Sequence, residues 1–220
     1  MRWRSRLDCE NLPFCSSGTR LKDLTTLGVG GPAECLARPV TRRDLTRILD
    51  LCREEEAPTW FIGGGSNVLI PDEGLPGVTI QTGGLNGVLW EEQDDSVVLE
   101  TESGVLLASL LALSMNKGWE GLEFSVGIPG TVGGALHGNA GVEGRSLGDL
   151  VESVLLVDDK GSLAWKRRQD IRFSYRFTDL LAGNRAIVAC KLVMKKGDPA
   201  KISSSVRSEE HTSELQSPNT

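Results

Sequence analysis

Two glycine-rich stretches restrict the fold of this 220-residue chain more than any other feature of its sequence. Glycine has no Cβ atom, so its backbone adopts positive φ angles and approaches neighbouring groups more closely than other residues can. The first stretch, residues 63–67, directly follows the β-prone run Thr-Trp-Phe-Ile at residues 59–62. We therefore predict a short strand that ends in a tight, glycine-rich turn.

The first stretch reads Gly63-Gly64-Gly65-Ser66-Asn67. Successive backbone N–H groups of such a turn can converge on one anion, which predicts a pyrophosphate site, and the side chains of Ser66 and Asn67 can add hydrogen bonds. The stretch is not a P-loop, because the pattern G-x-x-x-x-G-K-S/T is absent, and a G-x-G-x-x-G spacing followed by a helix signature is absent as well. Taken alone, it could equally be a turn that only needs positive φ angles.

The second stretch, residues 127–141, combines glycines with apolar residues, as expected for backbone packed against a large flat ligand. Pro129 fixes one φ angle, Gly133 and Gly134 permit close approach, and Asn139 can hydrogen-bond a ring edge. A purely structural loop is the alternative. The candidate ligand-binding residues of this stretch are Ile128, Pro129, Gly130, Thr131, Gly133, Gly134, Asn139 and Ala140.

Two helices and several short strands surround these stretches. Leu45, Ile48, Leu49 and Cys52 have helical spacing within residues 41–53, and Thr41 with Asp44 forms a variant capping box. A second helix is predicted at residues 105–116, ended by Gly118. Strands are predicted at residues 59–62, 78–81, 97–101, 151–157, 162–165 and 186–194, with 151–165 forming a hairpin. This mixture predicts an α+β fold, divided near residues 83–88.

Composition excludes several classes of function. The chain is 39% hydrophobic with a formal net charge of −6 and scattered basic residues, so nucleic acid is not an expected partner. Its apolar runs are too short to span a membrane and its amino terminus is polar, so we expect no membrane association and a cytoplasmic location. The cysteines lack metal or redox spacing and are predicted to be structural thiols: Cys9, Cys15, Cys35, Cys52 and Cys190.

Four stretches together carry a family resemblance: residues 26–33 (Thr-Leu-Gly-Val-Gly-Gly-Pro-Ala), 63–70, 127–141 and 173–176 (Phe-Ser-Tyr-Arg). Through them the chain resembles the UDP-N-acetylenolpyruvoylglucosamine reductases, also called UDP-N-acetylmuramate dehydrogenases. These belong to the flavoproteins with an FAD-binding domain of the vanillyl-alcohol-oxidase (PCMH) type. The resemblance implies an N-terminal extension (residues 1–20) and two α+β FAD-binding subdomains (residues 21–85 and 86–200). The family's third, substrate-binding domain is then missing.

The resemblance also implies a reaction. FAD is the expected cofactor and NADPH its reductant, and the enolpyruvyl ether of UDP-N-acetylglucosamine is reduced to UDP-N-acetylmuramate for peptidoglycan synthesis. Arg176 matches the family's active-site arginine, and Tyr175 is a candidate substrate-binding neighbour. A permanently charged, forked guanidinium suits a carboxylate that becomes an enolate. The partner would be a small nucleotide sugar, bound by a monomer; no metal is expected.

The sequence allows other interpretations of Arg176, of His137 and of the function of the whole chain. Arg176 could be an ordinary surface or ion-pairing arginine, because Arg167, Arg168 and Arg172 are close by. His137 stands where the family more often has an apolar residue, and we expect it to pack or hydrogen-bond rather than act as an acid or base. An FAD-linked oxidase or dehydrogenase of the same fold, and a non-catalytic nucleotide-binding module, are the rival interpretations.

The end of the chain looks foreign to the rest. Residues 207–217 resemble the translation of a common sequencing adapter, and residues 201–220 lack a strong apolar pattern, so we expect this end to be disordered. The family's proton-donating Ser, in a Gly-Ser-x-Phe-Lys-Asn-Pro motif, and its C-terminal Glu have no counterpart here. We therefore expect a C-terminally truncated chain with little activity of its own.

Overall fold

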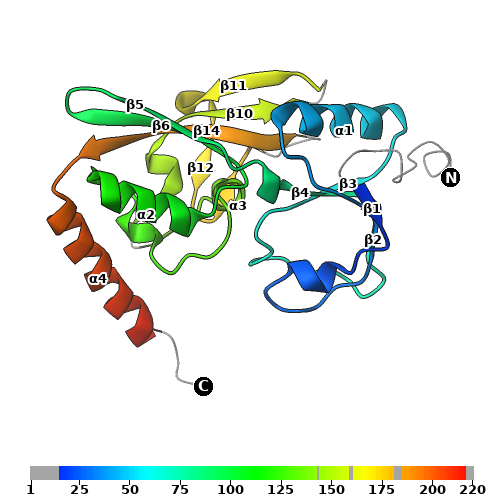
Figure 1. Cartoon of the computed structure of the whole chain (residues 1–220), viewed down its shortest axis with the longest axis horizontal. Coiled ribbons are helices and arrows are strands. Elements are labelled where there is room, and N and C mark those ends of the chain that lie inside the picture. Colours follow the sequence, from blue (N-terminus) through cyan, green and yellow to red (C-terminus); the bar gives the residue numbers. More distant parts are fainter. Residues whose placement is uncertain (1–14, 143, 159–160, 181–184, 217–220) are drawn as a thin grey trace.

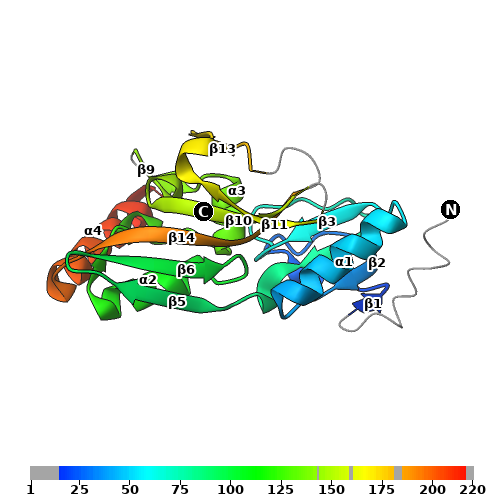
Figure 2. The ribbon, with the colours of Figure 1, turned by 90° about the horizontal axis from the view of Figure 1, so that it is seen from above.

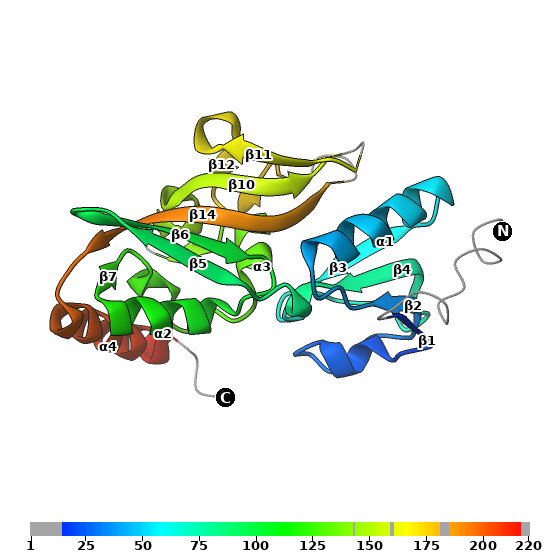
Figure 3. The ribbon, with the colours of Figure 1, turned by 45° about the horizontal axis from the view of Figure 1, so that its top comes forward.

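The computed structural model describes residues 15–142, 144–158, 161–180 and 185–216, with side chains described as far as residue 208. Two sheets lie side by side, and helix α1 (Arg42–Glu54) lies against the smaller one (Figure 1). Helices α2 (Leu107–Lys117) and α3 (Val132–His137) lie on one face of the larger sheet (Figure 3). This arrangement confirms the predicted α+β fold.

The smaller sheet holds the first glycine-rich stretch at the end of one of its strands. Its strand order is β1-β2-β4-β3, with β2 and β3 parallel to β4 and β1 antiparallel to β2. Residues 63–67 directly follow β3, as the sequence predicted. The strands are β1 (Cys15–Ser17), β2 (Ala33–Ala37), β3 (Thr59–Ile62) and β4 (Leu75–Gln81).

Helix α1 begins at the predicted capping box. The Thr41 side chain accepts a hydrogen bond from the Asp44 N–H, and the Asp44 carboxylate accepts one from the Thr41 N–H. Leu45, Ile48 and Cys52 are buried, so the predicted apolar face is the face that packs.

The larger sheet is antiparallel, with strand order β11-β10-β14-β6-β5 and the short β7 paired to β14. It begins at Val88, so the chain passes from one sheet to the other at residues 82–87. The predicted hairpin is present as β10 and β11, whereas residues 159–160 of its turn lie outside the described residues. The strands are β5 (Val88–Glu92), β6 (Ser96–Glu102), β7 (Trp119–Glu120), β10 (Val151–Val157), β11 (Leu163–Arg167) and β14 (Ala186–Lys196).

Two small ribbons stand apart from the larger sheet. β8 (Gly141–Val142) pairs with β9 (Arg145–Ser146), and β12 (Phe173–Ser174) pairs with β13 (Phe177–Thr178). Figure 2 shows β13 above α3, and the second ribbon carries the Tyr175–Arg176 turn.

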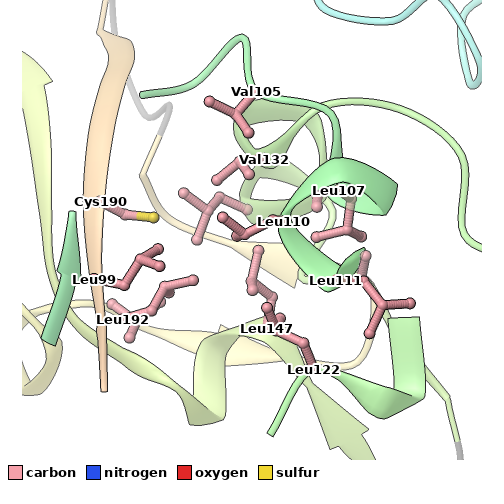
Figure 4. Packing of buried hydrophobic residues seen from close by; sticks show 14 of the residues in the cluster. Leu99, Val105, Leu107, Leu110, Leu111, Leu122, Val132, Leu147, Cys190 and Leu192 are labelled. Atoms are coloured by element: carbon pink, nitrogen blue, oxygen red, sulfur yellow. The ribbon is translucent and has the colours of Figure 1, made fainter. Parts of the chain in front are cut away.

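The main core lies between the larger sheet and helices α2 and α3 (Figure 4). Leu107, Leu110 and Leu111 of α2 face Leu99 of β6 and Leu192 of β14. Gly118 ends α2 with a φ angle of 72°, the left-handed conformation predicted for a C-cap glycine.

A second core cluster joins the two sheets. Apolar side chains of α1 and β4 pack with Leu155, Val157 and Val188 from the facing ends of β10 and β14. Beside this cluster the Arg42 guanidinium donates from Nε to Glu102 (2.7 Å) and from Nη2 to Glu100 (2.8 Å). Burial alone would lower the pKa of Arg42, but its hydrogen bonds to Glu100 and Glu102 more than offset this and raise it. α1 is therefore fixed to both sheets.

We expected disorder from residue 201 onward, and this expectation is wrong as far as residue 216. Helix α4 (Pro199–Gln216) forms there. Ile202 and Val206 are four residues apart, which places both on one helix face, and both are buried. That face lies beside α2. Two apolar residues in an otherwise polar segment are too short a pattern to predict a helix.

The cysteines are mostly buried thiols, as predicted. Cys52 and Cys190 are buried, and burial, followed by the proximity of Cys52, raises the pKa of Cys15 to about 11. Cys35 departs from the prediction because it is disulfide-bonded. Cys9 and residues 1–14 of the expected N-terminal extension lie outside the described residues. No helix in the described part of the chain is long and apolar enough to cross a membrane.

Candidate functional site

The two glycine-rich stretches meet where the two sheets adjoin. The Ser66 hydroxyl donates to the Pro129 carbonyl oxygen (3.3 Å). A Cβ atom on Gly64 would lie 3.0 Å from the Gly130 Cα, and one on Gly63 would collide with the Thr131 hydroxyl. Residues more than 60 positions apart thus form one site, made of a first glycine loop (residues 63–67) and a second glycine loop (residues 127–131).

Several backbone N–H groups at this junction have no hydrogen-bond acceptor among the described residues. Among the described residues, none accepts a hydrogen bond from the N–H groups of residues 64–67 or of residues 130–131. Unpaired N–H groups are costly unless water or a ligand satisfies them, and glycine loops present them to anions. The two loops therefore fit the pyrophosphate of a dinucleotide cofactor.

Glycine is required in the first loop for two different reasons. Gly65 has a φ angle of 68°, and a side chain there would collide with the Leu24 backbone. Gly65 therefore fits the purely structural interpretation of a tight turn. Gly63 and Gly64 instead allow the close approach of the second loop.

The second loop runs into α3. The buried Thr131 caps this helix, its hydroxyl accepting a hydrogen bond from the Gly134 N–H (3.4 Å). Gly134 is exposed, whereas a Cβ on Gly133 would lie 2.8 Å from the Cβ of Ser103. Gly134 is thus open to a ligand, and Gly133 serves packing within the protein.

The other candidate ligand-binding residues of the second stretch also divide into exposed positions and positions packed within the protein. Pro129 is exposed and Ile128 is partly buried against the main core. Ala140 belongs to the core and is only 7% exposed. The buried position of Ala140 does not support the predicted contact with a cofactor.

The Asn139 side chain makes two hydrogen bonds within the protein. Its Nδ2 donates to the Ser174 carbonyl oxygen (3.0 Å), and its Oδ1 accepts from the Gly148 N–H (3.0 Å). The predicted hydrogen bond of Asn139 to a ring edge stays a prediction. Its partners in the protein are backbone groups 9 and 35 positions away, so side-chain patterns carried no sign of them.

Tyr175 and Arg176 form the turn between β12 and β13. Tyr175 is 90% exposed, and Arg176 is exposed with a φ angle of 54°. Positive φ at the second turn residue is typical of a type II turn, a position that glycine normally fills. Within the described residues Arg176 has no hydrogen bond or ion pair, so its guanidinium is available to an anionic ligand.

Sequence reasoning missed the residues that hold this turn. Arg168 Nε donates to the Gly148 carbonyl oxygen (2.8 Å), and its guanidinium lies 4.6 Å from the centre of the Phe173 ring. In the sequence, Gly148 lies shortly after the second glycine-rich stretch and Arg168 belongs to a basic segment close to Arg176, and neither position indicates a contact with the turn.

Comparison with known proteins agrees with this geometry. The family described as "FAD binding domain" matches residues 33–166. The chain is 33% identical over 204 residues to the UDP-N-acetylenolpyruvoylglucosamine reductase of Syntrophus aciditrophicus (strain SB), covering 90% of this chain and 65% of that protein. It is 38% identical over 186 residues to the reductase of the same name from Synechococcus sp. (strain WH7803), covering 83% and 59%.

Solved structures give the same result. The UDP-N-acetylenolpyruvylglucosamine reductase (MurB) from Thermus caldophilus superimposes with a TM-score of 0.77 at 31% identity, covering 91% of this chain and 70% of that one. A cholesterol oxidase from Brevibacterium sterolicum, at 13% identity and a TM-score of 0.57, shares the fold alone.

The chain spans between 59% and 65% of the length of the two bacterial reductases compared by sequence. By its family match, its identity to these reductases and its fold, it belongs to the FAD binding domain family and, within it, to the UDP-N-acetylenolpyruvoylglucosamine reductases.

Proposed function

We propose that this chain binds FAD across the junction of its two sheets, with the pyrophosphate on the unpaired N–H groups of residues 64–67 and 130–131. The contact between the two glycine loops is the observation that carries the proposal. Gly63 and Gly65 shape the cradle, Ser66 and Asn67 supply side-chain donors, and Ile128, Pro129 and Gly134 offer surface to the isoalloxazine ring.

The whole protein, in this proposal, reduces the enolpyruvyl ether of UDP-N-acetylglucosamine to UDP-N-acetylmuramate in the cytoplasm, as a monomer. Bound FAD, once reduced by NADPH, would supply the hydride for the enolpyruvyl methylene carbon, and a general acid would then protonate the neighbouring carbon. Arg176 binds the substrate carboxylate and stabilises the negative charge that grows on it, since fixed donors stabilise developing charge best. The exposed Tyr175 lines the same side of the substrate. The names of the relatives and the unpaired Arg176 support this assignment.

The visible spectrum of the purified chain tests the cofactor. We expect flavin absorbance bands after incubation with FAD and bleaching of those bands by NADPH under anaerobic conditions. Absence of flavin binding would contradict the proposal. Rapid reoxidation by oxygen, with an alcohol or sugar as the reducing substrate, would instead favour a flavin oxidase.

We further propose that this 220-residue chain reduces the enolpyruvyl substrate only slowly by itself, because the family's Ser and Glu have no counterpart in the sequence. The test is NADPH oxidation that depends on the enolpyruvyl substrate. Steady oxidation at the rate of a full-length relative, measured side by side, would show that the assignment of essential residues is wrong.

A further inference from the structure

The ribbon that carries Tyr175 and Arg176 is too small to fix its own position. β12 and β13 are two residues long each and pair at Phe173–Thr178 and Ser174–Phe177, with one further backbone hydrogen bond from the Asp179 N–H to the Arg172 carbonyl oxygen (3.2 Å). Even a longer isolated hairpin is marginally stable in water. The position of the turn therefore depends on what the ribbon contacts.

Asn139 provides the central contact. Its side chain bridges the Ser174 carbonyl oxygen and the Gly148 N–H, both at 3.0 Å, and the residue is only 8% exposed. Its φ angle is 43°, a left-handed conformation that asparagine tolerates better than most residues. Both hydrogen-bonding ends of the amide are thus used in a backbone conformation that few side chains accept.

Gly148 and Arg168 complete the contact. A Cβ on Gly148 would lie 2.7 Å from the Phe173 ring and 2.8 Å from Asn139 Oδ1, so no other residue fits without displacing both. Arg168 bonds the Gly148 carbonyl oxygen and covers the Phe173 ring. Asn139, Gly148 and Arg168 together, called here the ribbon bracket, hold the first strand of the ribbon.

The ribbon bracket is joined to the second glycine loop by one short helix. Thr131 caps α3 at its start, and Gly138 and Asn139 follow its end. Six helical residues span about 9 Å, so the distance between the glycine loop and Asn139 is set by a rigid element.

We propose that Asn139 is a positioning residue, which fixes the Tyr175–Arg176 turn relative to the flavin-binding loop through Ser174 and Gly148. This rests on the proposed function only in treating Arg176 as the substrate-binding arginine. Asn139 itself contacts neither cofactor nor substrate in this proposal.

Backbone mobility of Tyr175 tests the proposal directly. Tyr175 is the only tyrosine of the chain, so labelling with 15N-tyrosine gives a single amide resonance from the turn. The informative variant is Asn139→Asp, because aspartate keeps the acceptor for the Gly148 N–H and replaces the donor to Ser174 with a charged acceptor oxygen. Asn86→Asp is the matched control, since Asn86 is exposed and makes no hydrogen bond within the described residues.

We expect an order parameter of about 0.85 for the Tyr175 amide in the unsubstituted chain and in Asn86→Asp, and below about 0.6 in Asn139→Asp. If Asn139→Asp fails to fold, the same order parameter is measured in Arg168→Ala, with Arg167→Ala as its control. Arg168 holds the other side of the ribbon bracket, so its loss should also lower the order of Tyr175. Equal Tyr175 order in every folded variant and in the unsubstituted chain would overturn the proposal.

Flavin binding separates this proposal from the proposed function. The affinity for FAD, measured by flavin fluorescence, should change less than about threefold in Asn139→Asp. Parallel loss of FAD affinity and Tyr175 order would instead make Asn139 a cofactor-binding residue and overturn the positioning role. If the unsubstituted chain does not bind FAD, the proposed function fails, while the order of Tyr175 still decides the role of Asn139.

Discussion

Arg176 occupies a backbone position that its side chain does not favour. Its φ angle of 54° costs a non-glycine residue roughly 1–2 kcal/mol, and no hydrogen bond of its side chain within the described residues offsets that cost. Strained residues of this kind concentrate at binding and catalytic sites. The local geometry therefore supports a role for the guanidinium in binding rather than in folding.

The strain at this position gives a stability prediction. Arg176→Gly should leave the free energy of unfolding unchanged or raise it by up to about 1 kcal/mol, because glycine relieves the strain but gains entropy in the unfolded chain. Arg176→Ala keeps the strain and should be the less stable of the two. Urea denaturation at 25 °C measures both, and a loss above about 1 kcal/mol in Arg176→Gly would show that the arginine stabilises the fold.

At the scale of elements, α4 shows how little apolar surface is needed to dock a helix. Ile202 and Val206 supply its buried face beside α2, and both belong to the segment before the adapter-like residues. The docking of α4 therefore depends on its first two turns.

Substitution within those turns tests the docking. Ile202→Ala should lower the free energy of unfolding by about 2–4 kcal/mol, since Ile202 is 2% exposed and its removal leaves a cavity. Ser204→Ala, on the exposed side of the same turn, should change it by less than about 0.5 kcal/mol. Thermal or urea unfolding measures the stability of both variants. An equal change in the free energy of unfolding for Ile202→Ala and Ser204→Ala would mean that α4 is not packed as described.

The whole molecule depends on how its two sheets are held together. The shared apolar cluster around α1 is one connection, and the Arg42 ion pairs with Glu100 and Glu102 are another. Both connections join segments far apart in sequence. They fix the junction at which the glycine loops meet.

Breaking the ion pairs should loosen this junction. We expect Arg42→Ala to lower the free energy of unfolding by about 1 kcal/mol, a modest value because the pair is partly exposed. Arg43→Ala, at the exposed neighbouring position, is the control and should be neutral. Denaturant unfolding in low and high salt tests whether the loss of stability is electrostatic. Added salt screens the ion pairs, so it should reduce the difference in the free energy of unfolding between the two variants.

Close approach of the loops gives a prediction for the cofactor site. A Cβ on Gly64 would lie 3.0 Å from backbone of the second loop, so Gly64→Ala should push the loops apart and weaken FAD binding by at least about tenfold. Gly83→Ala has open space around the added methyl group and should bind normally. Fluorescence titration with FAD measures both, and equal affinities would place the cofactor elsewhere.

Local sequence was sufficient for several elements and for the glycine-rich turn after β3. The capping box of Thr41 and Asp44, the apolar face of α1, the stop at Gly118 and the β10–β11 hairpin all depend on residues a few positions apart, so pattern and propensity predicted them. The α4 prediction failed because the contacts that hold this helix are with elements far away in the chain, α2, β7 and residues 123–125.

Sequence by itself thus determined the α+β fold and predicted one glycine-rich turn suited to an anion and a second glycine-rich stretch suited to a flat ligand. Only the tertiary structure decided that the two loops touch, that Ala140 is buried, and that the Asn139 amide serves Ser174 and Gly148. The physical reason is range: backbone conformation follows from neighbouring residues, whereas the partner of a side chain depends on how distant segments pack.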